Sequence, residues 1–231
     1  MTPQDRIIVA LDRPTTEQNL ALIEDLSGAG RFFKVGMRQY YAGADKIFAA
    51  IQRTGAKLFL DLKLHDIPAT VAGAMQSLSP IAPDLITLHA GGGAAMVRAA
   101  VDTLREHAPK TKILAVTILT SMDADDVRGL TGSEDVQGAV LRLAKRAVDA
   151  GAHGVVASPL EAAMLREALG DDALIVTPGV RPKGADLQDQ RRVMTPEDAL
   201  DAGADYLVIG RPIHGQDDPR AAFQKIVDQL R

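Results

Sequence analysis

The sequence contains no cysteine, and only 3% of its residues are aromatic. Without cysteine the chain has no disulfide bonds, no thiolate metal ligands and no thiol nucleophile. So few aromatic rings argue against stacking platforms for single-stranded nucleic acid. A net charge of −4 also provides no basic field that would attract a nucleic acid. We therefore expect no nucleic-acid partner.

Long uncharged apolar runs are also missing, since none approaches the ~18 residues that a membrane-crossing helix needs. The first residues, 1–6, lack the charged-then-apolar pattern of a secretory signal. We expect a cytoplasmic protein with no membrane partner. A chain of 231 residues with 46% hydrophobic content can bury a large core, and we predict one domain over residues 1–231.

What the chain does contain is a regular alternation of apolar runs and helical patterns. The predicted strands are 6–12, 31–36, 57–64, 85–89, 112–119, 154–158, 173–180 and 206–211. The main predicted helices are 15–27, 40–54, 68–79, 94–107, 136–150 and 160–169, with two more opening at Pro196 and Pro219. The strands are apolar throughout, which is typical of a parallel sheet covered on both faces. Eight such units predict an α/β fold, a single (β/α)8 TIM barrel, with a doubly wound open sheet as the alternative.

Charges interrupt the third predicted strand near its end. Strand alternation places Asp61 and Lys63 on one face and the neighbouring leucines on the other. Burying both charges costs several kcal/mol per ion unless each is paired and hydrogen-bonded. One interpretation is a structural ion pair. We favour a preorganised row of charges, extended by Asp66, that acts on a substrate.

Polar residues gather at the other strand exits as well, where (β/α)8 barrels place their chemistry. The residues at the predicted exits are Asp12, Lys34, Asp61, Lys63, His89, Thr120, Ser121, Ser158, Arg181, Gly210 and Arg211. The first halves of the same strands are mostly Ile, Val, Leu and Ala. Charges of both signs that converge on one mouth favour an active site there.

The last two exits predict a phosphate site. Gly210 lets a backbone N–H approach an anion, and Arg211 offers a bidentate fork beside it. Barrels frequently hold phosphate with the loops after strands seven and eight. The polar loop 181–192 is either a solvated connector or a lid over the phosphate, with Arg181 and Gln190 as gripping candidates.

Other polar residues have simpler interpretations. The glycines at 91–93 lack the spacing of a nucleotide-binding loop and are interpreted as a tight turn. The scattered histidines are interpreted as surface or capping residues: His107, His153 and His214. A divalent metal bound by His65, Asp61 and Asp66 is an alternative, but it would compete with the Lys63 ammonium. We expect no metal.

The pattern Asp61-x-Lys63-x-His65-Asp66-Ile67-Pro68-x-Thr70 resembles the signature of the orotidine 5′-phosphate decarboxylase family. The resemblance extends over the whole chain, with an Asp at the first strand exit and a Lys at the second. It continues in Leu119-Thr120-Ser121, in residues 177–181 and in residues 209–213. No position that the family's motif uses departs from it.

This resemblance implies a homodimeric decarboxylase that converts orotidine 5′-monophosphate to uridine 5′-monophosphate, the last step of de novo pyrimidine synthesis, with no cofactor. By the same resemblance, Asp12 holds ribose hydroxyls and Lys34 bridges the ribose and Asp61. Asp61 faces the substrate carboxylate, and Lys63 protonates C6 of the pyrimidine. The remaining implied assignments are Thr120 and Ser121 to the pyrimidine edge, Arg181, Gln190, Gly210 and Arg211 to the phosphate, and Asp66 and Thr70 to the neighbouring subunit's site.

The chemistry of the residues agrees with this resemblance. Loss of CO2 from a ring carbon leaves a carbanion that the ring does not delocalise, and a charged proton donor such as Lys63 stabilises it. Carboxylates nearby favour the charged form of such a donor. Three alternatives stay open: a Mg²⁺-dependent phosphate-sugar decarboxylase or aldol-type lyase on the same barrel, a Schiff-base aldolase with Lys63 as nucleophile, and a catalytically silent phosphate-binding barrel.

Overall fold

The apolar runs pair into a closed parallel barrel. The computed structural model describes residues 1–181 and 194–230. Within these residues, eight strands pair in chain order and β8 closes on β1. The strands are β1 (Ile7–Ala10), β2 (Phe32–Gly36), β3 (Lys57–Leu64), β4 (Leu85–His89), β5 (Lys112–Val116), β6 (Gly154–Val156), β7 (Leu174–Pro178) and β8 (Tyr206–Ile209). The predicted (β/α)8 TIM barrel is confirmed, and the open sheet is excluded.

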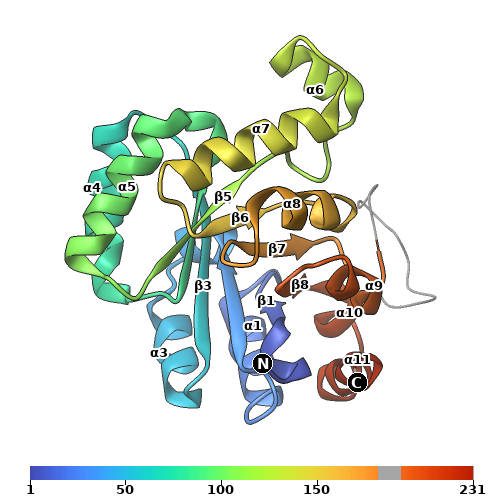
Figure 1. Cartoon of the computed structure of the whole chain (residues 1–231). Coiled ribbons are helices and arrows are strands. Elements are labelled where there is room, and N and C mark those ends of the chain that lie inside the picture. The colour runs from blue at the N-terminus through green and yellow to red at the C-terminus, as the bar shows by residue number, and fades with distance from the viewer. Residues whose placement is uncertain (182–193, 231) are drawn as a thin grey trace.

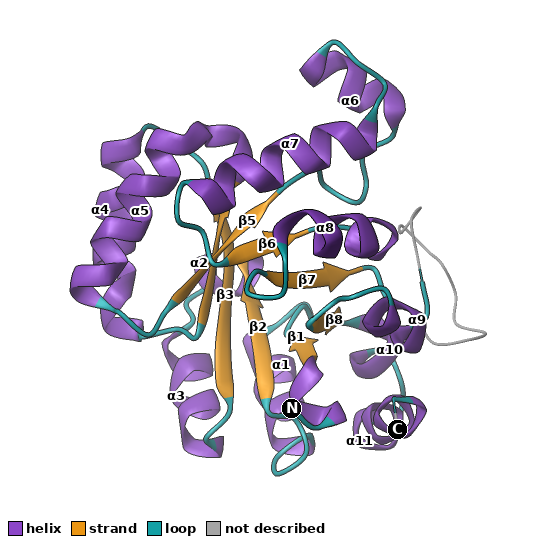
Figure 2. Ribbon diagram, viewed as in Figure 1, coloured by secondary structure: helices purple, strands orange, loops and turns teal. Residues whose placement is uncertain are grey.

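Most helices surround the barrel and bury an apolar face against the outward side of the strands (Figure 1, Figure 2). The helices are α1 (Thr16–Asp25), α2 (Met37–Tyr41), α3 (Asp45–Thr54), α4 (Pro68–Leu78), α5 (Gly93–His107), α6 (Ala124–Thr131), α7 (Val136–Asp149), α8 (Ala162–Leu169), α9 (Pro196–Asp201), α10 (Arg211–His214) and α11 (Pro219–Gln229). Short 3-10 helices are η1 (Pro3–Arg6), η2 (Ser79–Ile81), η3 (Ala90–Gly92) and η4 (Pro159–Glu161). Among the described helices, none is long and apolar enough to span a membrane.

Two predictions about helices were wrong. The helix predicted over 40–54 is split into α2 and α3, because Gly43 adopts a left-handed backbone with φ of +97° between them. Helix α6 was not predicted, although Asp123 and Asp126 form a capping box at its start. It projects from the body of the molecule in the connection between β5 and α7 (Figure 1).

Strands β5 to β8 also end earlier than predicted. The prediction extended each strand through its polar exit residues, whereas the structure ends the paired segments before them. Thr120 and Ser121 consequently lie in the loop after β5, and Arg181 lies beyond the end of β7. The polar exits are therefore loop residues supported by the barrel.

Side chains on the strands alternate between the inside of the barrel and the apolar cores beneath the helices. Outward residues such as Val9, Phe33 and Leu60 join the large core beneath the helices. The inward residues that fill the barrel are Ile8, Ala10, Phe32, Phe59, Leu85, Leu114, Val176 and Val208. Full burial of a large apolar side chain contributes about 1.5–3 kcal/mol. We call this inward set the apolar layer. It closes the barrel under the candidate site.

Candidate active site

Beyond the apolar layer the barrel opens into a cavity of about 730 Å³ at the C-terminal ends of the strands. Most of the site residues predicted from the sequence line this one cavity: Asp12, Lys34, Asp61, Lys63, Thr120, Ser121, Arg181, Gly210 and Arg211. They come from the exits of six strands, which explains why they are scattered along the chain. The fold therefore brings the predicted residues together.

Four of these side chains form a row of alternating charge. Lys34 Nζ lies 3.3 Å from Asp12 Oδ1 and 3.5 Å from Asp61 Oδ2. Lys63 Nζ lies 2.8 Å from the same Asp61 oxygen. Gly36 leaves room for this row, because a Cβ there would lie only 3.1 Å from Lys34 Nζ. The row runs Asp12–Lys34–Asp61–Lys63 and is called the charged row below.

Pairing within the charged row outweighs the effect of burial on its two inner members. Burial alone would lower the pKa of Lys34, but the carboxylates of Asp61 and Asp12 raise this pKa above its ordinary value. Burial would likewise raise the pKa of Asp61, but Lys34 and Lys63 hold it below its ordinary value. Both groups are therefore charged at neutral pH, which fixes the field at the bottom of the cavity.

The backbone that carries this row is irregular. Strand β3 leaves its regular register with β4 between Leu60 and Leu64, and Lys63 has a φ of +52°. A left-handed backbone costs an L-residue roughly 1–2 kcal/mol. Thr87 on β4 contacts both charged residues: its Oγ1 accepts the Lys63 backbone N–H at 2.8 Å and donates to Asp61 Oδ1 at 3.0 Å. Sequence analysis missed Thr87, whose only signal was its inward position two residues before His89.

The predicted phosphate residues lie at the exits of β7 and β8. Gly210 precedes Arg211, the first residue of α10, and both line the cavity. Arg181 is buried, and its Nη1 donates to the Val180 carbonyl at 3.0 Å. Gln190, the other gripping candidate, lies outside the described residues, as does most of the loop predicted as a lid.

Two further lining residues were not predicted to belong to the site. Arg38 of α2 adds a cation to the cavity wall. His214, interpreted above as a surface or capping residue, also lines the cavity. Burial lowers the pKa of His214 against the opposing effect of Asp12, so its ring is neutral at pH 7. Their signal was weak, because Arg38 precedes the helix predicted from residue 40 and His214 lies in α10, which was not predicted.

Asp66 and Thr70 are not brought into the cavity of their own chain. Both are exposed, and Asp66 Oδ1 accepts the backbone N–H of Ile67 at 2.6 Å. Among the described residues Asp66 has no ion-pair partner, so it does not extend the charged row. The first interpretation of Asp66, as part of one row with Asp61 and Lys63, is wrong for this chain taken alone.

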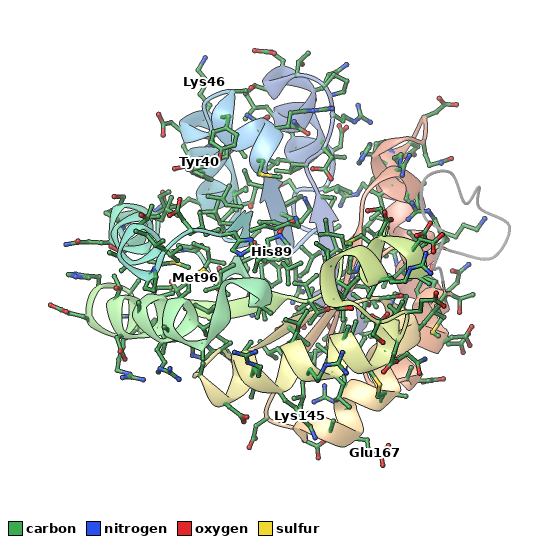
Figure 3. The ribbon with its side chains drawn as sticks, turned by 90° about the horizontal axis from the view of Figure 1, so that it is seen from above. Tyr40, Lys46, His89, Met96, Lys145 and Glu167 are labelled. Atoms are coloured by element: carbon green, nitrogen blue, oxygen red, sulfur yellow. The ribbon has the colours of Figure 1, made fainter. Side chains whose placement is uncertain are left out.

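His65 and His89 lie next to each other beside the site, with ring centroids 5.3 Å apart. Seen from above, His89 lies near the middle of the molecule, whereas Lys46 and Glu167 point outward from its rim (Figure 3). Burial, His65 and Lys63 together lower the pKa of His89. In the described part of the chain, no three His, Asp or Glu side chains are grouped to hold a metal ion.

A closed parallel barrel whose charged side chains line a cavity at the strand exits defines a (β/α)8 barrel of the enzyme type. Residues 5–226 match the Orotidine 5′-phosphate decarboxylase / HUMPS family. The chain belongs to this family, which confirms the resemblance seen in residues 61–70.

Similar proteins agree with this membership. The orotidine 5′-phosphate decarboxylase of Moorella thermoacetica is 46% identical, with 100% of this chain and 94% of that protein covered. The decarboxylase of the same name from Thermobifida fusca is 49% identical, with 97% and 95% covered. The crystal structure of orotidine 5′-phosphate decarboxylase from Lactobacillus acidophilus superposes with a TM-score of 0.85 at 39% identity, covering 97% of this chain and 98% of that one.

Proposed function

We propose that this chain decarboxylates orotidine 5′-monophosphate to uridine 5′-monophosphate and CO2, the last step of de novo pyrimidine synthesis, without a cofactor. The observation that carries the proposal is the charged row, in which Lys63 Nζ lies 2.8 Å from Asp61 in the wall of an open cavity. A proton donor beside a carboxylate suits a reaction in which CO2 leaves a carbon and a proton replaces it. Membership of the family supports the same reaction.

In the proposed step, the bond between C6 and the carboxylate carbon breaks and its electron pair stays at C6. The Lys63 ammonium gives a proton to C6, CO2 leaves, and the resulting amine regains a proton from solvent. A fixed cation aimed at the developing charge stabilises this transition state without reorganisation. Asp61 repels the substrate carboxylate but not neutral CO2, so its charge favours the departure of CO2, which is a form of ground-state destabilisation.

The rest of the cavity would hold the substrate at its two ends. Asp12 binds ribose hydroxyls, and Lys34, paired with both Asp12 and Asp61, bridges the ribose and the reacting end. Thr120 and Ser121 line the wall at the exit of β5 and hydrogen-bond to the pyrimidine edge. The phosphate is assigned to Arg181, Gln190, Gly210 and Arg211. Phosphate contacts far from C6 supply binding energy that orients the ring.

We also propose a homodimer in which Asp66 and Thr70 complete the neighbouring subunit's site. Both side chains are exposed and follow the charged row directly in the chain. Between them, Ile67 is 66% exposed, which suits a residue that a second copy covers. Each copy would be one catalytic domain over residues 1–231, placed in the cytoplasm.

The test of the reaction is the loss of ultraviolet absorbance from orotidine 5′-monophosphate in the presence of a chelator. The proposal expects turnover that the chelator leaves unchanged. Loss of activity on chelation would favour a Mg²⁺-dependent lyase, and trapping by borohydride with substrate would favour a Schiff-base aldolase. Binding without turnover would indicate a silent phosphate-binding barrel.

The shared site has its own test, which mixes a Lys63→Ala chain with an Asp66→Ala chain. A heterodimer has one site that combines an intact Lys63 with an intact Asp66. Random mixing should therefore restore about a quarter of the wild-type activity, since half of the dimers would have one good site of two. Two inactive chains that stay inactive after exchange would count against the shared site.

A further inference from the structure

The bulge in β3 leaves one residue of β4 facing the reacting end of the charged row. Leu60 pairs with Ile86 and Leu64 pairs with Leu88, so residues 61–63 of β3 face Thr87 alone. Bulges of this kind occur next to active sites, where they re-aim a side chain. Thr87 is fully buried at this point, in the wall of the barrel.

The hydroxyl group of Thr87 makes hydrogen bonds to both Lys63 and Asp61, the two residues proposed to act on the substrate. The backbone N–H of Lys63 can only donate, so Thr87 Oγ1 accepts it, at 2.8 Å. The one hydroxyl proton is then directed to Asp61 Oδ1, at 3.0 Å. Thr87 therefore holds the main chain of Lys63 and the side chain of Asp61 at the same time.

The Lys63 backbone requires such a contact. Its φ of +52° lies in the left-handed region, which residues with a Cβ rarely adopt. The bulge also removes Lys63 from the regular ladder between β3 and β4. Strained backbones of this kind persist where the surrounding structure holds them, and they cluster at active sites.

We propose that Thr87 is a positioning residue for the decarboxylation, which keeps the Lys63 ammonium and the Asp61 carboxylate in the geometry that the reaction needs. This inference rests on the function proposed above. Thr87 does not line the cavity, so its effect passes through the two residues that it holds. Its loss should slow the chemical step more than it weakens substrate binding.

The hydroxyl of Thr87 also influences the charge of Asp61. Burial raises the pKa of that carboxyl, and Lys34, Lys63 and the hydrogen bond from Thr87 lower it. Removing the hydroxyl therefore moves the Asp61 pKa upward. The acid limb of the pH–rate profile should move to higher pH in the same direction.

The experiment compares Thr87→Val, which keeps the shape but removes the hydroxyl, with Thr87→Ser, which keeps the hydroxyl. The matched control is Thr111→Val, because Thr111 is also buried but donates to the Pro83 carbonyl, away from the cavity. For each variant kcat, KM for orotidine 5′-monophosphate, the pH–rate profile and the thermal midpoint are measured.

Thr87→Val should lower kcat about 100-fold, the size of effect expected from a misplacement of about 1 Å. Its KM should stay within about three-fold of the wild-type value, since binding contacts are intact. Thr87→Ser should recover most of the loss in kcat. Thr111→Val should lower the thermal midpoint and leave kcat unchanged.

The inference is overturned if Thr87→Val keeps kcat within about two-fold of wild type with an unshifted acid limb. It is also overturned if Thr87→Ser is as slow as Thr87→Val. If Thr87→Val does not fold, Thr87→Ala against Thr87→Ser makes the same comparison. A wild-type chain with no turnover would remove the proposed function, whereas turnover with an indifferent Thr87 removes only this inference.

Discussion

Two layers of inward-facing side chains lie two residues apart along the same strands, and one is apolar whereas the other is polar. Phe32, Phe59 and Leu85 point inward in the apolar layer. Two residues further along the same strands, Lys34, Asp61 and Thr87 take their places, and all three are almost fully buried. The same backbone and the same inward direction thus serve packing in one layer and polar chemistry in the next.

Buried charges are tolerated in the second layer because they are paired. Isolated charges would cost several kcal/mol each at this depth, but in the charged row every inner charge has a partner of opposite sign. The apolar layer below excludes water and so strengthens the interactions between these charges. The apolar layer contributes packing and the charged row contributes the polar chemistry, and variants that affect only one of them test this division.

The largest expected effect on stability comes from Asp61→Ala, which interrupts the charged row. It leaves Lys34 buried with Asp12 as its remaining carboxylate and should lower the free energy of unfolding by about 3–5 kcal/mol. Urea unfolding measures this loss. Asp102→Ala is the control, because its pair with Arg105 is exposed and contributes at most about 1 kcal/mol. Equal losses in the two variants would contradict the dependence on burial.

The pH dependence of stability tests the pairing of Asp61, by comparing Asp61→Asn with wild type. The pKa of Asp61 is lowered from 3.8 in the folded chain, so its stabilising effect is complete above pH 3.8 and is lost as the pH falls through the lowered pKa. The pKa of Lys34 is raised from 10.5, so its contribution is lost only as the pH rises through that raised pKa. Urea unfolding between pH 3 and pH 8 measures the free energy of unfolding of both proteins. The difference between wild type and Asp61→Asn should stay constant above about pH 5. A difference that fades between pH 7 and pH 5 would contradict these directions.

Arg211→Ala should weaken binding of the substrate phosphate without disturbing the apolar layer or the charged row. A hydrogen bond to a charged group contributes about 1.5–3 kcal/mol, so Kd for uridine 5′-monophosphate should rise about 10- to 100-fold. Calorimetric titration measures this change, with uridine as the matched ligand that lacks the phosphate. If both ligands lose affinity equally, or neither does, the phosphate lies elsewhere.

The smallest effect is expected from Phe32→Leu in the apolar layer. The ring of Phe32 packs edge-to-face on Tyr206, with centroids 5.6 Å apart, and its loss should cost roughly 1 kcal/mol of unfolding free energy. Turnover should stay unchanged because Phe32 does not line the cavity. A large fall in kcat at nearly normal stability would show that packing in the apolar layer also affects catalysis at the charged row.

The sequence was sufficient for the barrel and for most of the cavity wall. Continuous apolar runs followed by single polar residues indicate buried parallel strands with a functional mouth, and Asp12, Lys34 and Arg211 could be placed there from position alone. Asp61 and Lys63 were predicted to share a face, and the 2.8 Å ion pair between them confirms this.

Other parts of the site had no local signal. The bulge in β3 and the left-handed Lys63 follow from how two strands meet, which alternation along one strand does not specify. Thr87 resembles any β-branched residue of a buried strand until its two hydrogen bonds are seen. The roles of Asp66 and Thr70 depend on a second chain and stay predictions.

The most direct measurement compares wild type with Lys63→Ala in turnover of orotidine 5′-monophosphate, with a chelator present and thermal midpoints measured in parallel. If Lys63 is the proton donor, turnover should fall at least about 1,000-fold, while the thermal midpoint shows that the barrel still folds. A folded Lys63→Ala variant that keeps more than about a tenth of the wild-type rate would contradict the assignment of the proton transfer to Lys63.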